Sequence, residues 1–187
     1  MLTPKIIEEL GVFLKKKFYL QVANAAVCLL LKPAVEDYEI LFVKRVKRQS
    51  DPWSGQIAFP GGKRDLVDRN LKDTIIREVF EETNIKLKEN NFVGALKIID
   101  SELNRNFKIL PFIALLKKNP RIELNKNELE SYFWISYDDF NRSKGNAGFG
   151  NKRVPAYIFG ENIVWGVTYN ILEMFCNYIE SIIKMKN

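Results

Sequence analysis

The sequence predicts a mixed-sheet α/β sandwich, with helices packed on one central sheet. Two observations carry this prediction. Short apolar segments typical of strands surround one internal helical pattern, and further helical patterns lie near both ends of the chain. With 187 residues and no linker or repeat, the chain is long enough for one well-buried core, so we expect residues 1–187 to form a single domain.

The N-terminal part is expected to hold one helix and the first strands. Apolar residues recur at helical spacing over residues 5–17, which favours an amphipathic helix packed on the domain. Residues 19–31 and 38–45 are apolar runs joined by a turn-like segment, so we expect two strands there. "SGQIAF" at residues 54–59 is a shorter strand candidate, and "PGG" at residues 60–62 should break the strand.

The internal helix should run from about Asn70 to Thr83. Asn70 and Asp73 are candidates for its N-cap, because short polar side chains can accept hydrogen bonds from the first free backbone N–H groups. Asn84 can adopt the left-handed conformation that commonly ends a helix.

The C-terminal part is expected to complete the sheet and to close the domain with a long helix. Gly160 should turn a hairpin between the last two strands. The expected elements are strands at 92–100, 107–118, 132–136, 154–159 and 161–164, a short helix or turn at 137–144, a glycine-rich loop at 144–153, and a helix at 165–184 whose stripe carries Leu172, Phe175, Cys176, Ile179 and Ile182.

The composition excludes several kinds of chemistry. The chain has no histidine, which rules out zinc sites built on histidine, Ser-His-Asp triads and histidine general bases. Cys28 and Cys176 lie in apolar runs and are expected to be buried hydrophobic residues, as in a reducing compartment. The N-terminus has the features of neither a signal peptide nor a membrane span. We therefore expect a cytoplasmic protein without a membrane partner.

Three carboxylates, Glu78, Glu81 and Glu82, gather near the end of the internal helix. Residues at these spacings share one face of a helix, here beside an apolar stripe, where repulsion between like charges is poorly screened. The C-terminal end of a helix also disfavours anions. A hard divalent cation such as Mg²⁺ or Mn²⁺ would remove this conflict. The alternative is a solvated acidic face paired with cations such as Arg77.

The residues around this helix resemble the sequence box of the Nudix hydrolases, G-x5-E-x7-R-E-U-x-E-E-x-G-U, in which U is apolar. Asp68 stands where the early Glu is expected, one extra residue separates it from Arg77, and Asn84 replaces the last Gly. Two adjacent glycines in "FPGGKRD" allow the backbone to approach phosphate or metal closely. The matching residues are, in order, Gly62, Arg77, Glu78, Val79, Glu81, Glu82 and Ile85.

The resemblance covers most of residues 22–180 and implies a Nudix-type α/β/α sandwich with a mixed central sheet. "SGQIAFPGG", "NELESYFWIS" and "VPAYIFGENIVWGVT" are similar to the coenzyme A diphosphatase-like branch of the family. The upstream signature of that branch is kept only in part within "LFVKRVKRQSDPWSG", where Leu41 and Arg45 match and neighbouring positions differ. Hydrolysis of a diphosphate is therefore implied more directly than a coenzyme A substrate.

By this resemblance, Mg²⁺ or Mn²⁺ would be held mainly by Glu78 and Glu82. Glu81 would be a further ligand or part of the water shell, and Gly61 would add a backbone carbonyl. Arg77 would orient the carboxylates of the box.

The general base is implied by the resemblance to come from a loop outside the box. Glu128 in "KNELESYF" is the candidate, with Glu82 as its competitor. Glu123 and Glu130 lie close to it in the sequence, and the plain alternative for Glu128 is a solvated loop residue.

Substrate contacts are expected from a few positions. Strand alternation places Arg45 and Lys44 on opposite faces, and Arg45, which matches the family arginine, is expected to reach phosphate. Gly62 would let the backbone approach the substrate, and Trp53 and Tyr157 could stack on a base.

The resemblance implies metal-dependent hydrolysis of a nucleoside diphosphate linked to another moiety, with coenzyme A or a derivative as the first candidate. The alternatives are ADP-ribose, a dinucleoside polyphosphate or a capped RNA end, or a Nudix-fold module that binds without turnover. A small-molecule nucleotide is the expected partner, nucleic acid is expected only as a capped RNA end, and the chain is expected to be a monomer or a homodimer.

Overall fold

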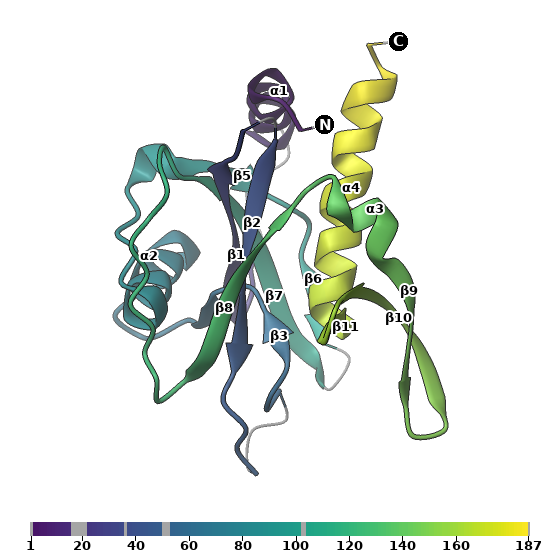
Figure 1. Ribbon diagram of the computed structural model, residues 1–187. Helices are drawn as coiled ribbons and strands as arrows, with labels where there is room; N and C mark the ends of the chain where they lie inside the picture. The colour runs from purple at the N-terminus through teal and green to yellow at the C-terminus, as the bar shows by residue number, and fades with distance from the viewer. Residues whose placement is uncertain (1, 16–21, 36, 50–52, 102–103, 187) are drawn as a thin grey trace.

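The computed structural model describes residues 2–15, 22–35, 37–49, 53–101 and 104–186. A mixed central sheet is flanked by helices, and a three-stranded sheet lies beside it (Figure 1). The elements are α1 (Pro4–Lys15), β1 (Ala25–Pro33), β2 (Tyr38–Arg45), β3 (Ile57–Ala58), β4 (Gly61–Lys63), α2 (Leu71–Thr83), the 3₁₀ turn η1 (Glu89–Asn91), β5 (Phe92–Ala95), β6 (Ile99–Ser101), β7 (Asn104–Leu115), β8 (Leu129–Ser136), α3 (Asp139–Ser143), β9 (Lys144–Phe149), β10 (Lys152–Phe159), β11 (Asn162–Trp165) and α4 (Gly166–Lys184).

The central sheet splits along one edge of β1. β7 runs parallel to β1 and pairs with it over residues 25–31. Since a strand has only two edges, the remaining partners of β1 must share the other one. β4 pairs antiparallel with residues 25–27 of β1, and β2 pairs antiparallel with residues 31–33. β1 and β2 therefore diverge from each other toward the start of β1.

Residues 57–63 fill the wedge between the diverging strands. β3 pairs with β2 at Val43 and Lys44, and β4 pairs with β1. Between them, the Cys28 N–H donates to the carbonyl of Pro60 at 2.8 Å. The adjacent glycines of β4 consequently lie where the sheet opens.

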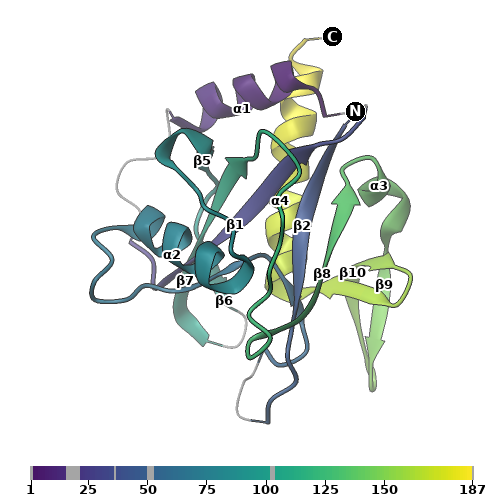
Figure 2. The ribbon, with the colours of Figure 1, turned by 60° about the vertical axis from the view of Figure 1, so that its left-hand side comes forward.

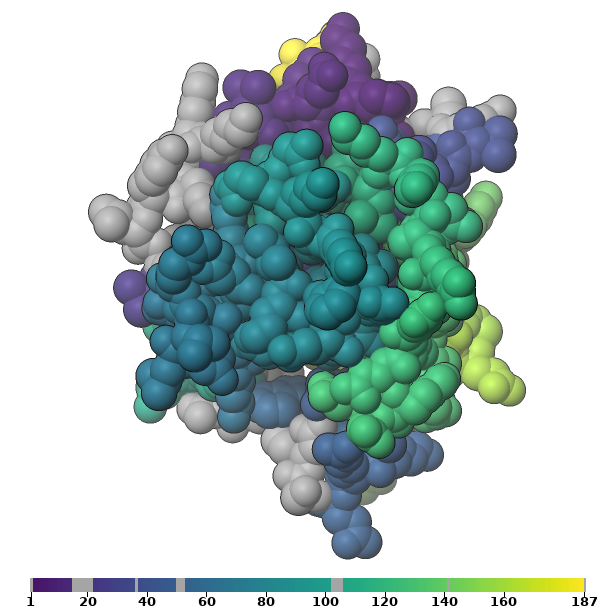
Figure 3. Space-filling view, turned by 90° about the vertical axis from the view of Figure 1, so that its left-hand side faces the viewer, coloured from purple at the N-terminus to yellow at the C-terminus, as the bar shows by residue number. Residues whose placement is uncertain are grey.

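Alternating side chains of β1 build a core on each face of the central sheet. Leu29 and Leu31 pack with the apolar faces of α1 and α4, whereas Cys28 and Leu30 pack with α2. Figure 2 shows α1 and α4 together on their side of the sheet, and Figure 3 shows α2 and the residues after it covering the opposite side. The α/β/α sandwich with a mixed sheet is confirmed, and the single domain over residues 1–187 stays a prediction.

The internal helix forms as predicted. α2 begins after Asn70, whose side chain accepts hydrogen bonds from the N–H groups of Lys72 and Asp73, so Asn70 and not Asp73 is the N-cap. The helix ends at Asn84, which adopts φ 60°. The predicted stripe of the closing helix is also buried: Leu172, Phe175, Cys176, Ile179 and Ile182.

Two sequence predictions about strands were wrong, and one strand was missed. The segment 92–100 forms two short strands, β5 and β6, which pair in succession with β7. Pro111 of β7 lies between the two pairings and has no N–H to donate to a ladder. The predicted break at "PGG" is confirmed, because β3 ends at Ala58, but Gly61 and Gly62 then form a strand of their own, β4, which was not predicted. The loop expected at 144–153 forms β9 and the start of β10, which pair with each other.

The ends of some elements differ from expectation. The first strand, which was expected over residues 19–31, begins at Ala25. Residues 19–21 of that prediction lie outside the described part of the chain. The N-terminal helix is described as far as Lys15, and residues 16–17 also lie outside. Among the described helices, none combines the length and the apolar composition needed to cross a bilayer.

Gly94 of β5 allows α1 to pack closely against the sheet. A Cβ at this position would lie 2.7 Å from the Cβ of Leu14 on α1. We expect Gly94→Ala to displace α1 and to lower the free energy of unfolding by about 1–3 kcal/mol, the usual cost of overpacking. Urea denaturation measures this loss. Gly148→Ala is the control, since a Cβ there would meet nothing within 4 Å. Equal stability of the two variants would contradict this packing.

Candidate active site

A cavity of about 540 Å³ opens at the wedge of the central sheet. Its walls come from β1, the end of β2, residues 53–63, α2, β7, Glu128 and the first two turns of α4. Segments that are far apart in the sequence therefore meet at one place. Both Glu78 and Glu82 of α2 line this cavity, as do Gly61 and Gly62 of β4.

Glu82 is the most deeply placed carboxylate of the cavity. The residue is 2% exposed, and its Oε2 accepts a hydrogen bond of 2.9 Å from the backbone N–H of Gly61. Gly61 has φ 144°, and a Cβ there would lie 2.3 Å from the carbonyl oxygen of Ala26. Only glycine fits this close approach of β4 to β1, and the approach brings the N–H to Glu82.

Glu78 lies one turn before Glu82 and packs against the second glycine. A Cβ on Gly62 would be 2.5 Å from the carboxylate of Glu78. The glycine pair thus admits both carboxylates: Gly61 gives a backbone donor, and Gly62 leaves space. The side chain of Glu78 is 16% exposed, whereas that of Glu81 is 51% exposed. Glu81 therefore lies outside the cavity, on the border of the same helix face.

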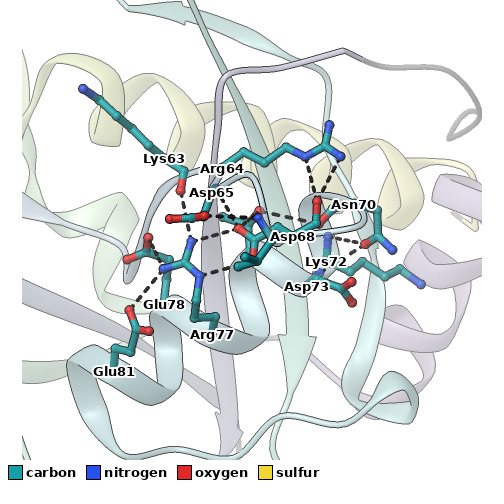
Figure 4. Close-up of polar contacts among 12 residues, drawn as sticks. Lys63, Arg64, Asp65, Asp68, Asn70, Lys72, Asp73, Arg77, Glu78 and Glu81 are labelled. Carbon is teal, nitrogen blue, oxygen red and sulfur yellow. Dashed lines mark hydrogen bonds and ion pairs between the residues drawn. The ribbon is translucent and has the colours of Figure 1, made fainter.

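Arg77 connects the carboxylates of the helix to the loop before it (Figure 4). Its Nη1 donates to Glu78 Oε1 at 2.8 Å and to Glu81 Oε2 at 3.1 Å. Its Nε and Nη2 donate to both carboxylate oxygens of Asp68, at 3.2 and 2.9 Å, and Nη2 also reaches the carbonyl of Lys63. One planar guanidinium holds these groups in fixed directions.

Asp68 is the buried anchor of this network. It is 5% exposed, and its Oδ2 also accepts hydrogen bonds from the Asp65 N–H and the Thr74 hydroxyl, both at 2.9 Å. Hydrogen bonds from Arg77 hold the pKa of Asp68 well below its usual range. An aspartate in place of the early glutamate of the sequence box is therefore a fixed partner of Arg77 in this chain.

Glu128 reaches the cavity because its loop caps the end of α2. The N–H groups of Glu123 and Asn125 donate to the carbonyls of Thr83 and Glu82, at 3.1 and 3.0 Å. These carbonyls have no partner within the helix itself, so the loop satisfies them. The Asn125 side chain then donates to Glu128 Oε1 at 3.0 Å. Glu128 lines the cavity together with Glu78 and Glu82.

The other two candidate bases lie elsewhere. Glu130 pairs with Lys44 at 2.8 Å, and Glu123 pairs with Arg121 at 3.1 Å and accepts from the Asn84 side chain. Neither lines the cavity. The position of Glu128 distinguishes it from its neighbours in the sequence.

The carboxylates of the cavity oppose one another electrostatically. Burial, with the negative charges of Glu78 and Glu128, raises the pKa of Glu82 to about 8, although the Gly61 N–H and Arg45 act in the opposite direction. Burial likewise raises the pKa of Glu78, and the charges of Glu81 and Glu128 add to this effect against that of Arg77. The positive charges and N–H donors near these carboxylates therefore do not fully compensate their burial and mutual repulsion.

The donor set fits a hard divalent cation that brings other ligands with it. Within the described residues, no three carboxylate or thiol side chains converge closely enough to form a complete metal cage. Mg²⁺ commonly takes only one or two carboxylates and completes its shell with water and substrate phosphates. Glu78, Glu82 and the backbone of Gly61 could supply the protein ligands of such an ion. A cation would also favour the charged form of Glu82, whose pKa is raised first by burial and then by the neighbouring carboxylates.

The predicted substrate residues divide into two groups. Arg45, Gly62 and Trp53 line the cavity, and their contact with substrate stays a prediction. Tyr157 does not: it is fully buried between the hairpin and α4, and its hydroxyl donates to Glu173. The expectation that Tyr157 stacks on a base was wrong, because alternation along β10 turns this ring into the core.

Some cavity residues were missed by the sequence interpretation. Phe107 of β7 lies 5.9 Å from Trp53 between ring centroids, and the ammonium group of Lys63 lies 5.7 Å from the Phe107 ring. The first two turns of α4 also line the cavity. These residues were missed because an apolar residue in a strand or at the start of a helix looks the same in the sequence whether it lines a cavity or packs in the core.

A glycine pair at a split sheet, with a helix that brings its carboxylates to the opening, defines a domain of the Nudix type. The NUDIX domain model matches residues 22–156, and the chain belongs to the Nudix hydrolase family. The peroxisomal coenzyme A diphosphatase ndx-8 of Caenorhabditis elegans is 33% identical over 75% of this chain and 60% of its own length. A Nudix hydrolase named NudL from Yersinia enterocolitica is 30% identical over 67% of each chain.

Other similarities are partial or concern the fold alone. A Schizosaccharomyces pombe protein, C14C4.10c, is 36% identical over 54% of this chain, but the match spans only 32% of that relative. A MutT/nudix family protein from Enterococcus faecalis superposes with a TM-score of 0.60 at 13% identity, covering 92% of this chain and 69% of its own. The NUDIX domain of Shewanella oneidensis NrtR, solved with ADP-ribose, gives 0.55 at 14% identity, covering 87% and 90%.

The raised pKa of Glu82 gives the stability of the metal-free protein a defined pH dependence. The folded state holds this proton up to a pH of about 8, whereas the unfolded chain releases it near its ordinary pKa. The free energy of unfolding should therefore fall as the pH rises through this window. In EDTA, we expect Glu82→Gln to remove this loss and to unfold several degrees above wild type at pH 9.

Thermal unfolding between pH 5 and 9 measures the effect. Glu81→Gln is the control, because this half-exposed side chain of the same helix lies outside the cavity, and its curve should run parallel to that of wild type. If the melting temperatures of wild type and Glu82→Gln changed with pH in the same way across this range, the raised pKa assigned to Glu82 would be contradicted.

Proposed function

We propose that the protein hydrolyses the diphosphate bond of a nucleoside diphosphate linked to another moiety, in a reaction that depends on Mg²⁺ or Mn²⁺. The observation that carries this proposal is the meeting of Glu78, Glu82 and Glu128 in one cavity beside the glycine pair. Two of these carboxylates come from the family box, and the third comes from a loop that caps the same helix. The cavity itself holds ample space for a nucleotide-sized ligand.

Glu78 and Glu82 would hold the divalent cation, with Glu81 completing its water shell and the Gly61 carbonyl adding a backbone oxygen. When bound, such a cation neutralises charge on the phosphate oxygens and favours ionisation of a nearby water. Arg77 acts as a positioning residue, since its hydrogen bond fixes one oxygen of Glu78.

Glu128 is the proposed general base. It takes a proton from the attacking water as an oxygen–phosphorus bond forms and the bridging phosphorus–oxygen bond breaks, which leaves two phosphomonoesters. Asn125 binds one oxygen of Glu128 and leaves the other for the water. Glu82 is the alternative base, although its backbone hydrogen bond and its deep burial favour the role of a ligand.

Coenzyme A or a derivative is the proposed substrate. The named activity of the Caenorhabditis elegans relative supports this choice, as does Arg45, which lines the cavity. ADP-ribose, a dinucleoside polyphosphate and a capped RNA end are the alternatives, and a module that binds without turnover is the least favoured because all three box carboxylates are present. Cytoplasmic location and the monomeric or homodimeric state stay predictions.

A substrate panel tests the proposal. The protein is incubated with Mg²⁺ or Mn²⁺ and each candidate substrate, and the products are identified by mass. We expect diphosphate cleavage that EDTA abolishes. Glu82→Gln should abolish turnover, and Glu128→Gln should lower kcat by about 100-fold or more, as expected for loss of a general base.

Glu130→Gln is the matched control for Glu128→Gln. It makes the same change two residues away, on a side chain that pairs with Lys44 outside the cavity. We expect its kcat to equal that of wild type. Full activity of Glu82→Gln, or equal losses in Glu128→Gln and Glu130→Gln, would contradict the assigned roles.

A further inference from the structure

The first two turns of α4 form part of the wall of the cavity. Val167, Thr168 and Ile171 line the same space as Glu78 and Glu82. These three residues lie beyond residues 22–156, the region that the family model matches. The carboxylates come from the matched region, whereas this wall comes from an element that the match does not include. It is therefore a place where this chain can set its own substrate preference.

Two features hold the start of α4 in place. Gly166 has φ 61°, a conformation that favours glycine, and it turns the chain from β11 directly into α4. The Thr168 hydroxyl donates to the carbonyl of Ile57 in β3 at 3.1 Å, which ties the helix to the wedge of the sheet. Because that donor is already used, the start of α4 presents mainly the apolar groups of Val167 and Ile171 to the cavity.

Apolar residues continue this wall along the sheet. Ala25 and Val27 of β1 and Ile109 of β7 line the cavity, and Phe59 lies between the two short strands of the wedge. Val27 packs against the same core cluster as Val167, so they belong to the α4 side of the sheet. The cavity thus combines a carboxylate-rich part on α2 with an apolar part next to α4.

We propose that the start of α4 is a specificity-determining wall that contacts the methyl-bearing part of an uncharged chain joined to the diphosphate, as in the pantetheine chain of coenzyme A and its thioesters. This inference rests on the proposed hydrolysis. It names the part of the substrate that would be selected by the α4 wall, which consists of Val167, Thr168 and Ile171. A sugar in the same position would place hydroxyl groups against side chains that offer them no partner, which is unfavourable. The two methyl groups that pantetheine carries next to its phosphate ester would instead gain from being removed from water against the same side chains.

A matched pair of substrates isolates this preference. Dephospho-coenzyme A and ADP-ribose share the adenosine diphosphate half and differ in the attached moiety, a pantetheine chain in one and a ribose in the other. We expect wild type to prefer dephospho-coenzyme A in kcat/KM. Val167→Asn should raise KM for this substrate by about tenfold, the usual effect of a lost apolar contact in a pocket, while kcat and the values for ADP-ribose change little.

Two further variants keep the test independent of folding. Val167→Thr nearly preserves the shape of the side chain and should cause a smaller change in the same direction, with an unchanged melting temperature. Val35→Asn makes the same polar replacement at a fully exposed residue. It should change neither KM nor kcat for either substrate. Equal losses for both substrates in Val167→Asn, or a wild-type preference for ADP-ribose, would overturn the inference.

Calorimetric binding of dephospho-coenzyme A in EDTA separates this inference from the proposed reaction. Suppose that no substrate is hydrolysed, but dephospho-coenzyme A binds wild type and binds Val167→Asn more weakly. The proposed hydrolysis is then wrong, whereas the proposed contact between α4 and the ligand is supported. If diphosphates are hydrolysed but Val167→Asn binds and cleaves both compounds as wild type does, the proposed hydrolysis is supported. The proposed role of α4 in substrate preference is then wrong.

Discussion

The structure depends on keeping negative charge at an apolar boundary. Glu82 is almost fully buried, and Glu78 and Glu128 line the same cavity. Their mutual repulsion would favour an open, solvated arrangement, yet the Gly61 N–H and the Arg77 guanidinium hold the carboxylates where they are. Those donors offset the burial of Glu82 and the repulsion only in part, so the pKa of Glu82 stays above its ordinary value. In the proposed function, a divalent cation would remove the remaining conflict.

The split of the central sheet makes this arrangement possible. A sheet paired evenly along its length would separate α2 on one face from α4 on the other. Because β2 and β4 share one edge of β1, residues 57–63 occupy a wedge through which the carboxylates of α2 meet a wall of α4. The loop that carries Glu128 reaches the same wedge by capping the end of α2. One topological feature thereby brings together residues that are distant in the sequence.

The sequence predicted the parts of this site that local pattern encodes. Asn70 and Asn84 marked the ends of α2, and helical spacing placed Glu78 and Glu82 on one face. The β4 strand was missed because glycine normally breaks strands, whereas Gly61 is required here by a contact with Ala26. Tyr157 was misassigned and the α4 wall was overlooked for a related reason: whether an aromatic or aliphatic side chain faces a core or a cavity is decided by tertiary packing, which residue type does not reveal.

Crystals of the protein soaked in Mn²⁺ would show whether a divalent cation binds these carboxylates, because anomalous scattering locates this ion without reference to any assumed reaction. We expect an anomalous peak within coordination distance of Glu78 and Glu82 in wild type, and its loss in Glu82→Gln. A map without a peak at these carboxylates in wild-type crystals, or one whose peak persists unchanged in Glu82→Gln, would contradict the proposed cation site.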